Sequence, residues 1–233
     1  MARNFKNAST EHITFTSFAG NFSAVTYAAW VNPTSFTIGI NFAGVIASPS
    51  SPGLYLGLGK VLAYFSGSCT GATTLVAGNW YHIAATCITA SGNATVYLNG
   101  VSDGTATALN ANGIATTGYI GWDNSNNYFD GNIADAAYWS AALTPVEIKA
   151  LYSGVRPGNI RPQSLVGWFP LDGYGAPALN RTNTGTNGVL TGTSFVTGPS
   201  LLNAAPIFPG VPAPAFFLGP APPLFTLMPQ IVM

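Results

Sequence analysis

The chain has 233 residues, of which 48% are hydrophobic and only 6% are charged, against roughly 25% charged residues in an ordinary soluble domain. Seven Lys and Arg residues balance seven Asp and Glu residues, so the formal net charge is zero. This composition excludes a basic surface for nucleic acid and a charged disordered chain. Because few charges keep copies apart, we expect the chain to associate, as a homo-oligomer or with other subunits.

Short stretches of apolar, β-branched and aromatic residues, separated by turns, occupy residues 11–139. Alternation of polar and apolar residues, as in residues 11–18, indicates a strand with one buried face. We predict strands at residues 11–18, 26–31, 36–42, 54–58, 61–65, 81–88, 95–98, 119–122 and 133–139. Many short strands without long helical stretches between them are typical of an antiparallel sandwich or barrel.

One short helix is predicted directly after the last of these strands. Thr144 and Glu147 have the spacing of a capping box, in which each side chain bonds the backbone N–H of the other. Pro145 suits the first helical position, and Gly154 stands where a left-handed cap is expected.

Two cysteines, Cys69 and Cys87, are too few for a disulfide scaffold. We interpret them as two buried thiols, with a disulfide between neighbouring strands as the alternative. No run of 18 or more apolar residues occurs, so we expect no membrane-spanning helix. The first residues lack the apolar run of a secretory signal, so we expect a chain that is mature as given or exported by another route.

The character of the chain changes after Arg156, where prolines become frequent. Residues 165–173 predict one further strand with a turn, within a Pro- and Gly-rich extension at residues 156–198. Nine of the 17 prolines fall in residues 199–233, which have no charge and many large apolar side chains. Proline at this density excludes a regular helix or a central strand.

We therefore predict that residues 199–233 form an extended, Pro-rich C-terminal arm that becomes ordered by docking on a partner. Large apolar side chains that enter pockets would supply the affinity, because prolines remove backbone donors. The predicted anchors are Phe208, Phe216, Phe217, Leu224 and Phe225. The alternative is that the arm folds back over its own domain.

Several pieces between residues 78 and 154 resemble, in order and spacing, the laminin-G-like and concanavalin A-like jelly-roll domains. They are Gly-Asn-Trp-Tyr-His-Ile-Ala at residues 78–84, Val-Tyr-Leu-Asn-Gly at 96–100, Tyr-Ile-Gly at 119–121, Phe-Asp-Gly-Asn-Ile-Ala-Asp at 129–135, and Leu-Thr-Pro-Val-Glu-Ile-Lys-Ala-Leu-Tyr at 143–152. Residues 27–33 resemble the first core strand of that family. The likeness covers residues 5–155, about two thirds of the chain.

The resemblance implies an all-β fold in which residues 1–155 form a two-sheet antiparallel jelly-roll sandwich with one short helix. Members of the family bind carbohydrate, bind protein or serve as structural modules. On this basis we expect the following fold-defining side chains to be largely buried: Trp30, Trp80, Ile83, Tyr97, Ile120, Ile133 and Trp139.

Some relatives hold calcium at the rim of the sandwich. Asp123, Asn124 and Asn126 present oxygen atoms suited to such a hard cation, and they suit a polar hairpin tip equally. Calcium is the one cofactor that the sequence suggests, and the suggested site contains a single carboxylate, that of Asp123.

No catalytic residues are predicted, and we expect that the chain is not an enzyme. Glycosidases need two facing carboxylates, and none of the seven acids lies in the Glu-x-Asp-x-Glu strand pattern of the jelly-roll glucanases that the resemblance suggests. Asp135 lies inside a predicted strand and is the only unusual one of the acids; we expect it to face solvent or to accept hydrogen bonds from a loop. His82 alternates with apolar residues and is interpreted as a surface or packing residue. No Gly-x-Ser-x-Gly motif occurs.

Residues 165–198 also resemble segments that lie beside such domains in phage virion structural proteins. We therefore interpret the chain as a non-enzymatic virion protein, a phage capsid decoration or cement subunit or a fibre-associated subunit. It would assemble into the virion in the host cytoplasm, with the jelly roll displayed and the arm docked on other virion subunits.

Two alternatives to a virion role stay open. One is an extracellular carbohydrate-binding or adhesin module, in which surface aromatic residues such as Tyr128 contact glycans. The other is a filament subunit, in which the arm of one chain inserts into the next. The sequence does not predict the host, the ligand or the order of the oligomer.

Overall fold

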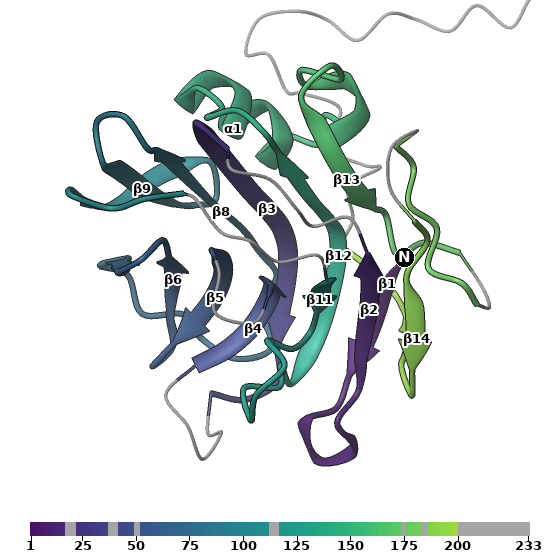
Figure 1. Ribbon diagram of the computed structural model, residues 1–233. Coiled ribbons are helices and arrows are strands. Elements are labelled where there is room, and N and C mark those ends of the chain that lie inside the picture. The colour runs from purple at the N-terminus through teal and green to yellow at the C-terminus, as the bar shows by residue number, and fades with distance from the viewer. Residues whose placement is uncertain are drawn as a thin grey trace, which may run out of the picture.

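The computed structural model describes residues 1–16, 22–36, 42–48, 52–111, 117–173, 176–182 and 186–199. These residues form two antiparallel sheets that pack face to face as a sandwich, with one α-helix beside them (Figure 1). The predicted all-β, two-sheet jelly roll is therefore confirmed.

The larger sheet has eight strands within the described residues. Seven of them lie in the order β10 (Val101–Ala106), β9 (Asn93–Leu98), β8 (Tyr81–Ile88), β3 (Ala24–Pro33), β12 (Gly131–Trp139), β1 (Ala2–Phe5) and β15 (Ser194–Val196). The eighth, β13 (Leu165–Phe169), pairs with the end of β12, while β1 pairs with its beginning.

The smaller sheet has seven strands in the described part of the chain. Their order is β14 (Val189–Thr191), β2 (His12–Thr16), β11 (Thr117–Ile120), β4 (Phe42–Ala47), β5 (Gly53–Gly57), β6 (Lys60–Tyr64) and β7 (Ser68–Thr70). Two short 3₁₀ turns, Asn7–Ser9 and Pro157–Asn159, lie outside the sheets.

The main core lies between the two sheets and is built from alternate residues of their strands. Phe15 of β2 and Ile120 of β11 face Ile83 of β8 and Ile133 of β12 in one cluster of buried apolar side chains. Burial of such side chains contributes about 1.5–3 kcal/mol each, so this cluster is the principal stabilising feature of the sandwich.

Burial is confirmed for five of the seven predicted core residues: Ile83, Tyr97, Ile120, Ile133 and Trp139. It is wrong for Trp30 and Trp80, which are half-buried. Trp80 lies before β8, so its side chain is not placed by the sheet. Trp30 lies in β3 but points away from the core, because its neighbours Ala29 and Val31 occupy the core face.

The helix α1 (Pro145–Tyr152) covers the outer face of the larger sheet and confirms the predicted capping box. The Thr144 hydroxyl accepts a hydrogen bond from the Glu147 backbone at 3.3 Å, and the Glu147 carboxylate accepts one from the Thr144 backbone at 2.7 Å. Ile148 and Leu151 then bury against Trp139 in a second apolar cluster. The indole N–H of Trp139 donates to the carbonyl of Ile160 at 2.8 Å.

Strands from the predicted extension at residues 156–198 enter both sheets. β13 and β15 belong to the larger sheet, and β14 pairs with β2 in the smaller sheet. The arm at residues 199–233 lies outside the described residues apart from Pro199. Its five predicted anchors also lie outside them: Phe208, Phe216, Phe217, Leu224 and Phe225.

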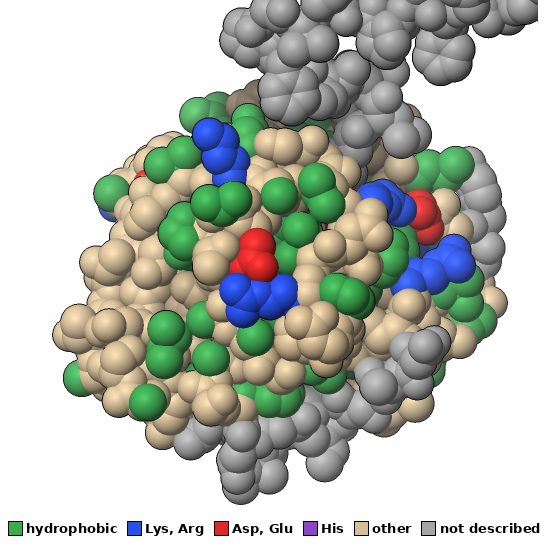
Figure 2. Space-filling model, turned by 90° about the horizontal axis from the view of Figure 1, so that it is seen from above, with side chains coloured by type: hydrophobic (Ala, Val, Ile, Leu, Met, Phe, Trp, Pro, Cys, Tyr) green, Lys and Arg blue, Asp and Glu red, His purple; other side chains and the backbone are tan. Residues whose placement is uncertain are grey.

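Charged side chains are few on the molecular surface, and the face seen from above is mostly apolar or neutral (Figure 2). Asp135 is buried in β12, where the Arg156 guanidinium donates to one carboxylate oxygen at 3.0 Å and the Trp168 indole donates to the other at 3.0 Å. Arg156 also binds Asp172 at 3.1 Å. Asp135 therefore accepts hydrogen bonds from a loop residue, Arg156, as one of the two sequence interpretations expects, and also from Trp168 of β13.

The two cysteines are free and buried, which confirms the interpretation as thiols. Cys69 lies in β7 and Cys87 in β8, so they belong to different sheets. Burial, together with the neighbouring Cys69, raises the pKa of the Cys87 thiol to about 11.

Candidate functional site

The outer face of the smaller sheet carries an unusual group of aromatic and apolar side chains. In the hairpin of β5 and β6, Leu54 and Leu56 point into the main core. Tyr55 alternates with them and therefore points outward, where it packs against Leu62 in a small separate cluster. Tyr64 follows Leu62 by two residues and lies on the same face.

A loop between β11 and β12, residues 121–130, lies directly on the outer face of β4. A Cβ atom added at Gly44 would stand 2.6 Å from the carbonyl carbon of Trp122, so only glycine permits this close approach. The backbone N–H of Gly44 donates to the carbonyl of Asn127 at 3.0 Å. The loop is closed at its base by a bond from the Phe129 N–H to the Gly121 carbonyl at 2.9 Å.

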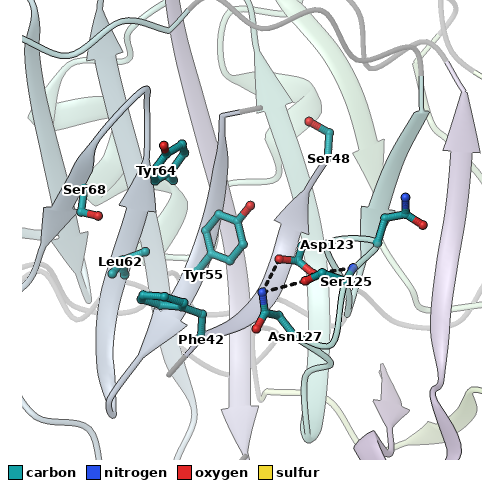
Figure 3. Close-up of a pocket in the computed structure, with 10 residues that line it drawn as sticks. Phe42, Ser48, Tyr55, Leu62, Tyr64, Ser68, Asp123, Ser125 and Asn127 are labelled. Carbon is teal, nitrogen blue, oxygen red and sulfur yellow. Dashed lines mark hydrogen bonds between the residues drawn. The ribbon is translucent and has the colours of Figure 1, made fainter. Parts of the chain in front are cut away.

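The sheet and this loop form the walls of a pocket of about 680 Å³ that is open to solvent (Figure 3). Its walls combine aromatic rings and leucine from the sheet with small polar side chains, mostly from the loop. The lining residues are Phe42, Ser48, Tyr55, Leu62, Tyr64, Ser68, Asp123, Asn124, Ser125 and Asn127. Figure 3 shows the ring of Tyr55 between Tyr64 and Leu62 on one side and Asp123 on the other.

Two of the aromatic rings in the pocket are open to solvent. Phe42 is 39% exposed and Tyr64 is 42% exposed, although both belong to strands whose other apolar residues are buried. Tyr55 is only 8% exposed and forms the floor between them. Large exposed aromatic side chains in a concave site are typical of ligand-binding surfaces.

The polar wall is held in shape by hydrogen bonds inside the loop. Asp123 Oδ1 accepts from the backbone N–H of Ser125 at 2.9 Å and from its hydroxyl at 2.6 Å. Asp123 Oδ2 accepts from the side-chain nitrogen of Asn127, which also donates to the Ser125 hydroxyl at 2.9 Å. The indole N–H of Trp122 donates to the carbonyl of Ser125.

These contacts bear on the predicted calcium residues, Asp123, Asn124 and Asn126. Both oxygens of the Asp123 carboxylate already accept hydrogen bonds within the loop, and the side chains of Asn124 and Asn126 are exposed. Among the described residues, no group of three or more His, Cys, Asp or Glu side chains is placed to hold a metal ion. The donor set thus fits a hydrogen-bonded hairpin tip better than a calcium cage, and the calcium site stays a prediction.

Two buried polar atoms at the pocket have no hydrogen-bond partner in the described structure. One is the hydroxyl oxygen of Ser48, a residue that is 1% exposed, and the other is Oδ1 of Asn127. A buried polar group without a partner costs about 1–3 kcal/mol, so such groups commonly indicate where a ligand or water completes the site.

The one charged group among the described residues that line the pocket is the carboxylate of Asp123. Burial, and after it the nearby Asp123 carboxylate, raises the pKa of the Tyr55 hydroxyl well above its ordinary value. Tyr55 therefore remains protonated and presents a neutral phenol at the floor of the pocket.

A second aromatic cluster lies on the same face of the sheet, around Trp122. The ring of Tyr128 stacks on Trp122 with a centroid distance of 5.1 Å and an interplanar angle of 4°. His12 lies 4.6 Å from Trp122 and Tyr119 lies 4.9 Å from it. Tyr128, which the sequence suggested as a glycan contact, thus stacks on Trp122 within the loop and is not among the residues that line the pocket.

Sequence reasoning missed the aromatic part of the pocket. Tyr55, Leu62 and Tyr64 lie on one face by simple alternation across the predicted strands 54–58 and 61–65. The pairing of Tyr55 with Leu62 in the hairpin register brings them together, and this register follows from a two-residue turn at Leu58-Gly59, where both residues have positive φ. The position of Asp123 opposite them had no sequence signal.

In the described part of the chain, no helix has the length and apolar character needed to cross a membrane.

A family model described as the Concanavalin A-like lectin/glucanases superfamily matches residues 7–149 of the chain. Comparison with the curated proteins finds no match.

Solved structures with the same fold include several carbohydrate-related proteins. A protein of Bacteroides ovatus described as a candidate carbohydrate-binding protein superposes with a TM-score of 0.66 at 22% identity, over 83% of this chain and 58% of its own length. A heptameric SAP-like pentraxin of Limulus polyphemus gives a TM-score of 0.55 at 17% identity, over 68% of this chain and 86% of its own.

Domain 4 of an extracellular arabinanase of Geobacillus stearothermophilus, solved in complex with arabinotriose, gives a TM-score of 0.53 at 18% identity, over 65% of this chain and 76% of its own. At these identities the likeness establishes the fold alone. The chain spans little more than half the length of the Bacteroides protein, 58%.

Proposed function

The chain belongs to the concanavalin A-like lectin/glucanases superfamily, and from this membership we propose that it is a non-catalytic carbohydrate-binding module. The observation that carries the proposal is the pocket on the outer face of the smaller sheet, where exposed aromatic rings face polar side chains across a concave surface. Its volume of about 680 Å³ lies within the roughly 300–1,000 Å³ usual for ligand sites.

The chemistry of the pocket suits a sugar. Pyranose and furanose rings present C–H groups on their faces and hydroxyl groups at their edges. The rings of Phe42 and Tyr64 offer apolar surfaces for the C–H groups, while Ser48 and Asn127 hold unpartnered polar atoms for the hydroxyls. The Bacteroides protein described as a candidate carbohydrate-binding protein and the arabinanase domain solved with arabinotriose support this assignment.

The absence of catalysis is part of the proposal. Glycoside hydrolysis requires two carboxyl groups on either side of the scissile bond, roughly 5–10 Å apart. Asp123 is the one carboxylate among the residues that line the pocket, and its oxygens accept bonds from Ser125 and Asn127. Asp135, the buried acid of β12, forms an ion pair with Arg156. It lies in the larger sheet and therefore does not supply a second carboxylate to the pocket.

Carbohydrate binding favours the extracellular alternative over the virion interpretation. The named relatives include an extracellular enzyme domain and a candidate carbohydrate-binding protein, and none of the three is a virion protein. The virion role, the oligomeric state and the docking of the arm through Phe208 and the other anchors stay predictions.

The test is binding of the full chain to an array of plant, microbial and animal glycans, compared with two pocket variants. We expect Phe42→Ala and Tyr64→Ala each to weaken binding about tenfold or more, because a stacked ring buries apolar area and contributes about 0.5–1.5 kcal/mol beyond that burial. Both side chains are partly exposed, so the fold should persist. The matched control is Tyr152→Ala, an equally exposed tyrosine (40%) on α1. Binding that both pocket variants retain in full would refute the assignment of the site.

A further inference from the structure

We infer that the pocket accepts neutral glycans that donate hydrogen bonds through their hydroxyl groups, and that it rejects glycans carrying carboxylate or sulfate groups. This inference rests on the proposed function and defines the substrate class of the same site. Three independent features support it: the charge of the lining, the direction of the hydrogen bonds in the loop, and the unpartnered atoms.

The charge of the pocket lining is of one sign. Of the ten lining residues that the structure describes, Asp123 is the one that is charged at neutral pH, and none is Lys or Arg. The carboxylate acts across the cavity, because it contributes, after burial, to the raised pKa of the Tyr55 hydroxyl. A carboxylate on a ligand would meet the same repulsion that disfavours a negative charge on Tyr55.

The hydrogen-bond donors of the loop are turned inward. Asn127 donates from its side-chain nitrogen to Asp123 and to Ser125, so both of its N–H groups are used. The backbone and hydroxyl groups of Ser125 both donate to Asp123. The side-chain donors of Asn127 and Ser125 are therefore used inside the loop, and Asn127 Oδ1 is the acceptor that these two residues leave for a ligand.

The two buried polar atoms at the pocket without a partner in the described structure, Asn127 Oδ1 and the Ser48 hydroxyl oxygen, can both accept hydrogen bonds from a ligand. Asn127 Oδ1 is a pure acceptor that is buried without a partner, and the Ser48 hydroxyl can accept or donate. A sugar hydroxyl satisfies such an acceptor, because it carries a proton to donate. A carboxylate or sulfate group that faces Asn127 at neutral pH carries acceptors only, so it would leave Oδ1 unsatisfied and add charge beside Asp123.

The aromatic side of the pocket does not distinguish neutral glycans from acidic ones. Phe42 and Tyr64 can stack on any sugar ring, whatever its substituents, and they set affinity without sensing charge. Selectivity then depends on the polar wall, while binding as such depends on the rings. The two contributions can be separated by experiment.

The experiment measures binding of the full chain to matched pairs of glycans that differ in charge alone. Suitable probes are methyl-esterified and de-esterified oligogalacturonides of equal length, sialyllactose and its carboxyl methyl ester, and galactosides with and without a sulfate. We expect the neutral member of each bound pair to bind about tenfold more tightly or better at low salt. The ratio should shrink as salt is raised, because screening weakens repulsion but leaves hydrogen bonds in place.

Asp123→Asn should reduce the ratio to less than about threefold, since it removes the charge and keeps the shape of the side chain. Asp103→Asn is the matched control, because Asp103 in β10 also accepts hydrogen bonds, from the backbone N–H and the hydroxyl of Thr73, but does not line the pocket. This control should keep the wild-type ratio. If Asp123→Asn does not fold, the salt dependence of the affinity ratio in the unmodified chain tests the role of the charge instead.

Acidic members that bind as tightly as neutral ones, with both lost in Tyr64→Ala, would overturn the inference and leave the proposed function standing. A wild-type ratio that does not change with salt or in Asp123→Asn would overturn the role of the charge. If neither member of any pair binds, the proposed function fails, and the inference fails with it.

Discussion

Gly44 in β4 lies directly beneath the backbone of Trp122, so closely that a Cβ atom would stand 2.6 Å from both the carbonyl carbon and the carbonyl oxygen of that residue. This contact fixes the height of the 121–130 loop above the sheet. The polar wall of the pocket, including Asp123 and Asn127, is placed by it. Because Gly44 has no side chain, the loop can lie this close to the sheet, and its position determines the shape of the pocket.

Gly44→Ala should lift the loop away from β4. We expect a loss of about 1–3 kcal/mol in the free energy of unfolding, the usual cost of inserting a methyl group into packed structure. Glycan binding should fall as well, because the polar wall moves away from Tyr55 and Tyr64. Thermal unfolding and binding titrations measure the two effects. Gly173→Ala is the control, since nothing lies within 4 Å of a Cβ there; equal stability of the two variants would contradict the account.

Ser48→Ala should separate stability from binding. The Ser48 hydroxyl is buried without a partner, so its removal should leave the free energy of unfolding unchanged or raise it. A hydrogen bond to a ligand contributes about 0.5–1.5 kcal/mol, so glycan affinity should fall about two- to tenfold.

Thr26→Val gives the contrasting case for Ser48→Ala. The Thr26 hydroxyl donates to the Ala141 carbonyl at 2.7 Å and accepts from the Leu143 N–H at 2.9 Å. Its removal leaves both groups unpaired and should cost about 1–3 kcal/mol. Chemical denaturation measures both variants. A Ser48→Ala protein destabilised as much as Thr26→Val would show that the Ser48 hydroxyl has a partner.

His82 should make stability fall at mildly acidic pH. It is 2% exposed between Trp30 and Tyr152, and burial lowers the pKa of its ring to about 3. The unfolded chain binds a proton below about pH 6.5, whereas the folded chain does so only near pH 3. The free energy of unfolding should therefore decrease as pH falls between these values, by up to about 1.4 kcal/mol per pH unit.

The measurement is denaturant unfolding at pH 7.5 and pH 5 for the wild type and for His82→Leu. The variant should lose less stability over this interval, because its side chain takes no proton in either state. Burial raises the pKa of Asp135, which acts in the opposite direction but equally in both proteins. A loss of the same size in His82→Leu would assign the pH dependence to other groups.

The tryptophans should differ in their contribution to stability. Trp139 is fully buried and its indole N–H is bonded to Ile160, so Trp139→Ala should cost about 3–5 kcal/mol. Trp80 is half-buried before the start of β8, so Trp80→Ala should cost clearly less. Unfolding midpoints of the two variants decide this order, and a larger loss in Trp80→Ala would contradict the observed packing.

Most strands were predictable because one of their faces is buried, and the exceptions have identifiable physical causes. β4 is almost continuously apolar and carries a register shift between Gly44 and Ile46, which breaks the period of two. β10 is largely exposed, and β7 has only three residues, so neither presents an apolar alternation.

The site was less predictable than the fold because its parts come from separate segments. Alternation places Tyr55 and Tyr64 on one face, but it does not tell which face is open to solvent. The approach of Asp123 to them depends on how the loop lies across Gly44, a tertiary contact without a sequence pattern. The sequence drew attention to Asp123 as a calcium ligand, whereas the structure places it in the wall of a pocket.

The central claim is that a glycan binds on the outer face of the smaller sheet. The most direct test is to record backbone NMR spectra of the full chain during titration with an oligosaccharide that it binds on the array. If a glycan binds in the pocket, we expect chemical-shift changes concentrated at residues 42–48, 53–57, 60–64 and 121–130, with little change in α1. Changes concentrated at α1 and the outer face of the larger sheet, with the pocket residues unaffected, would contradict it.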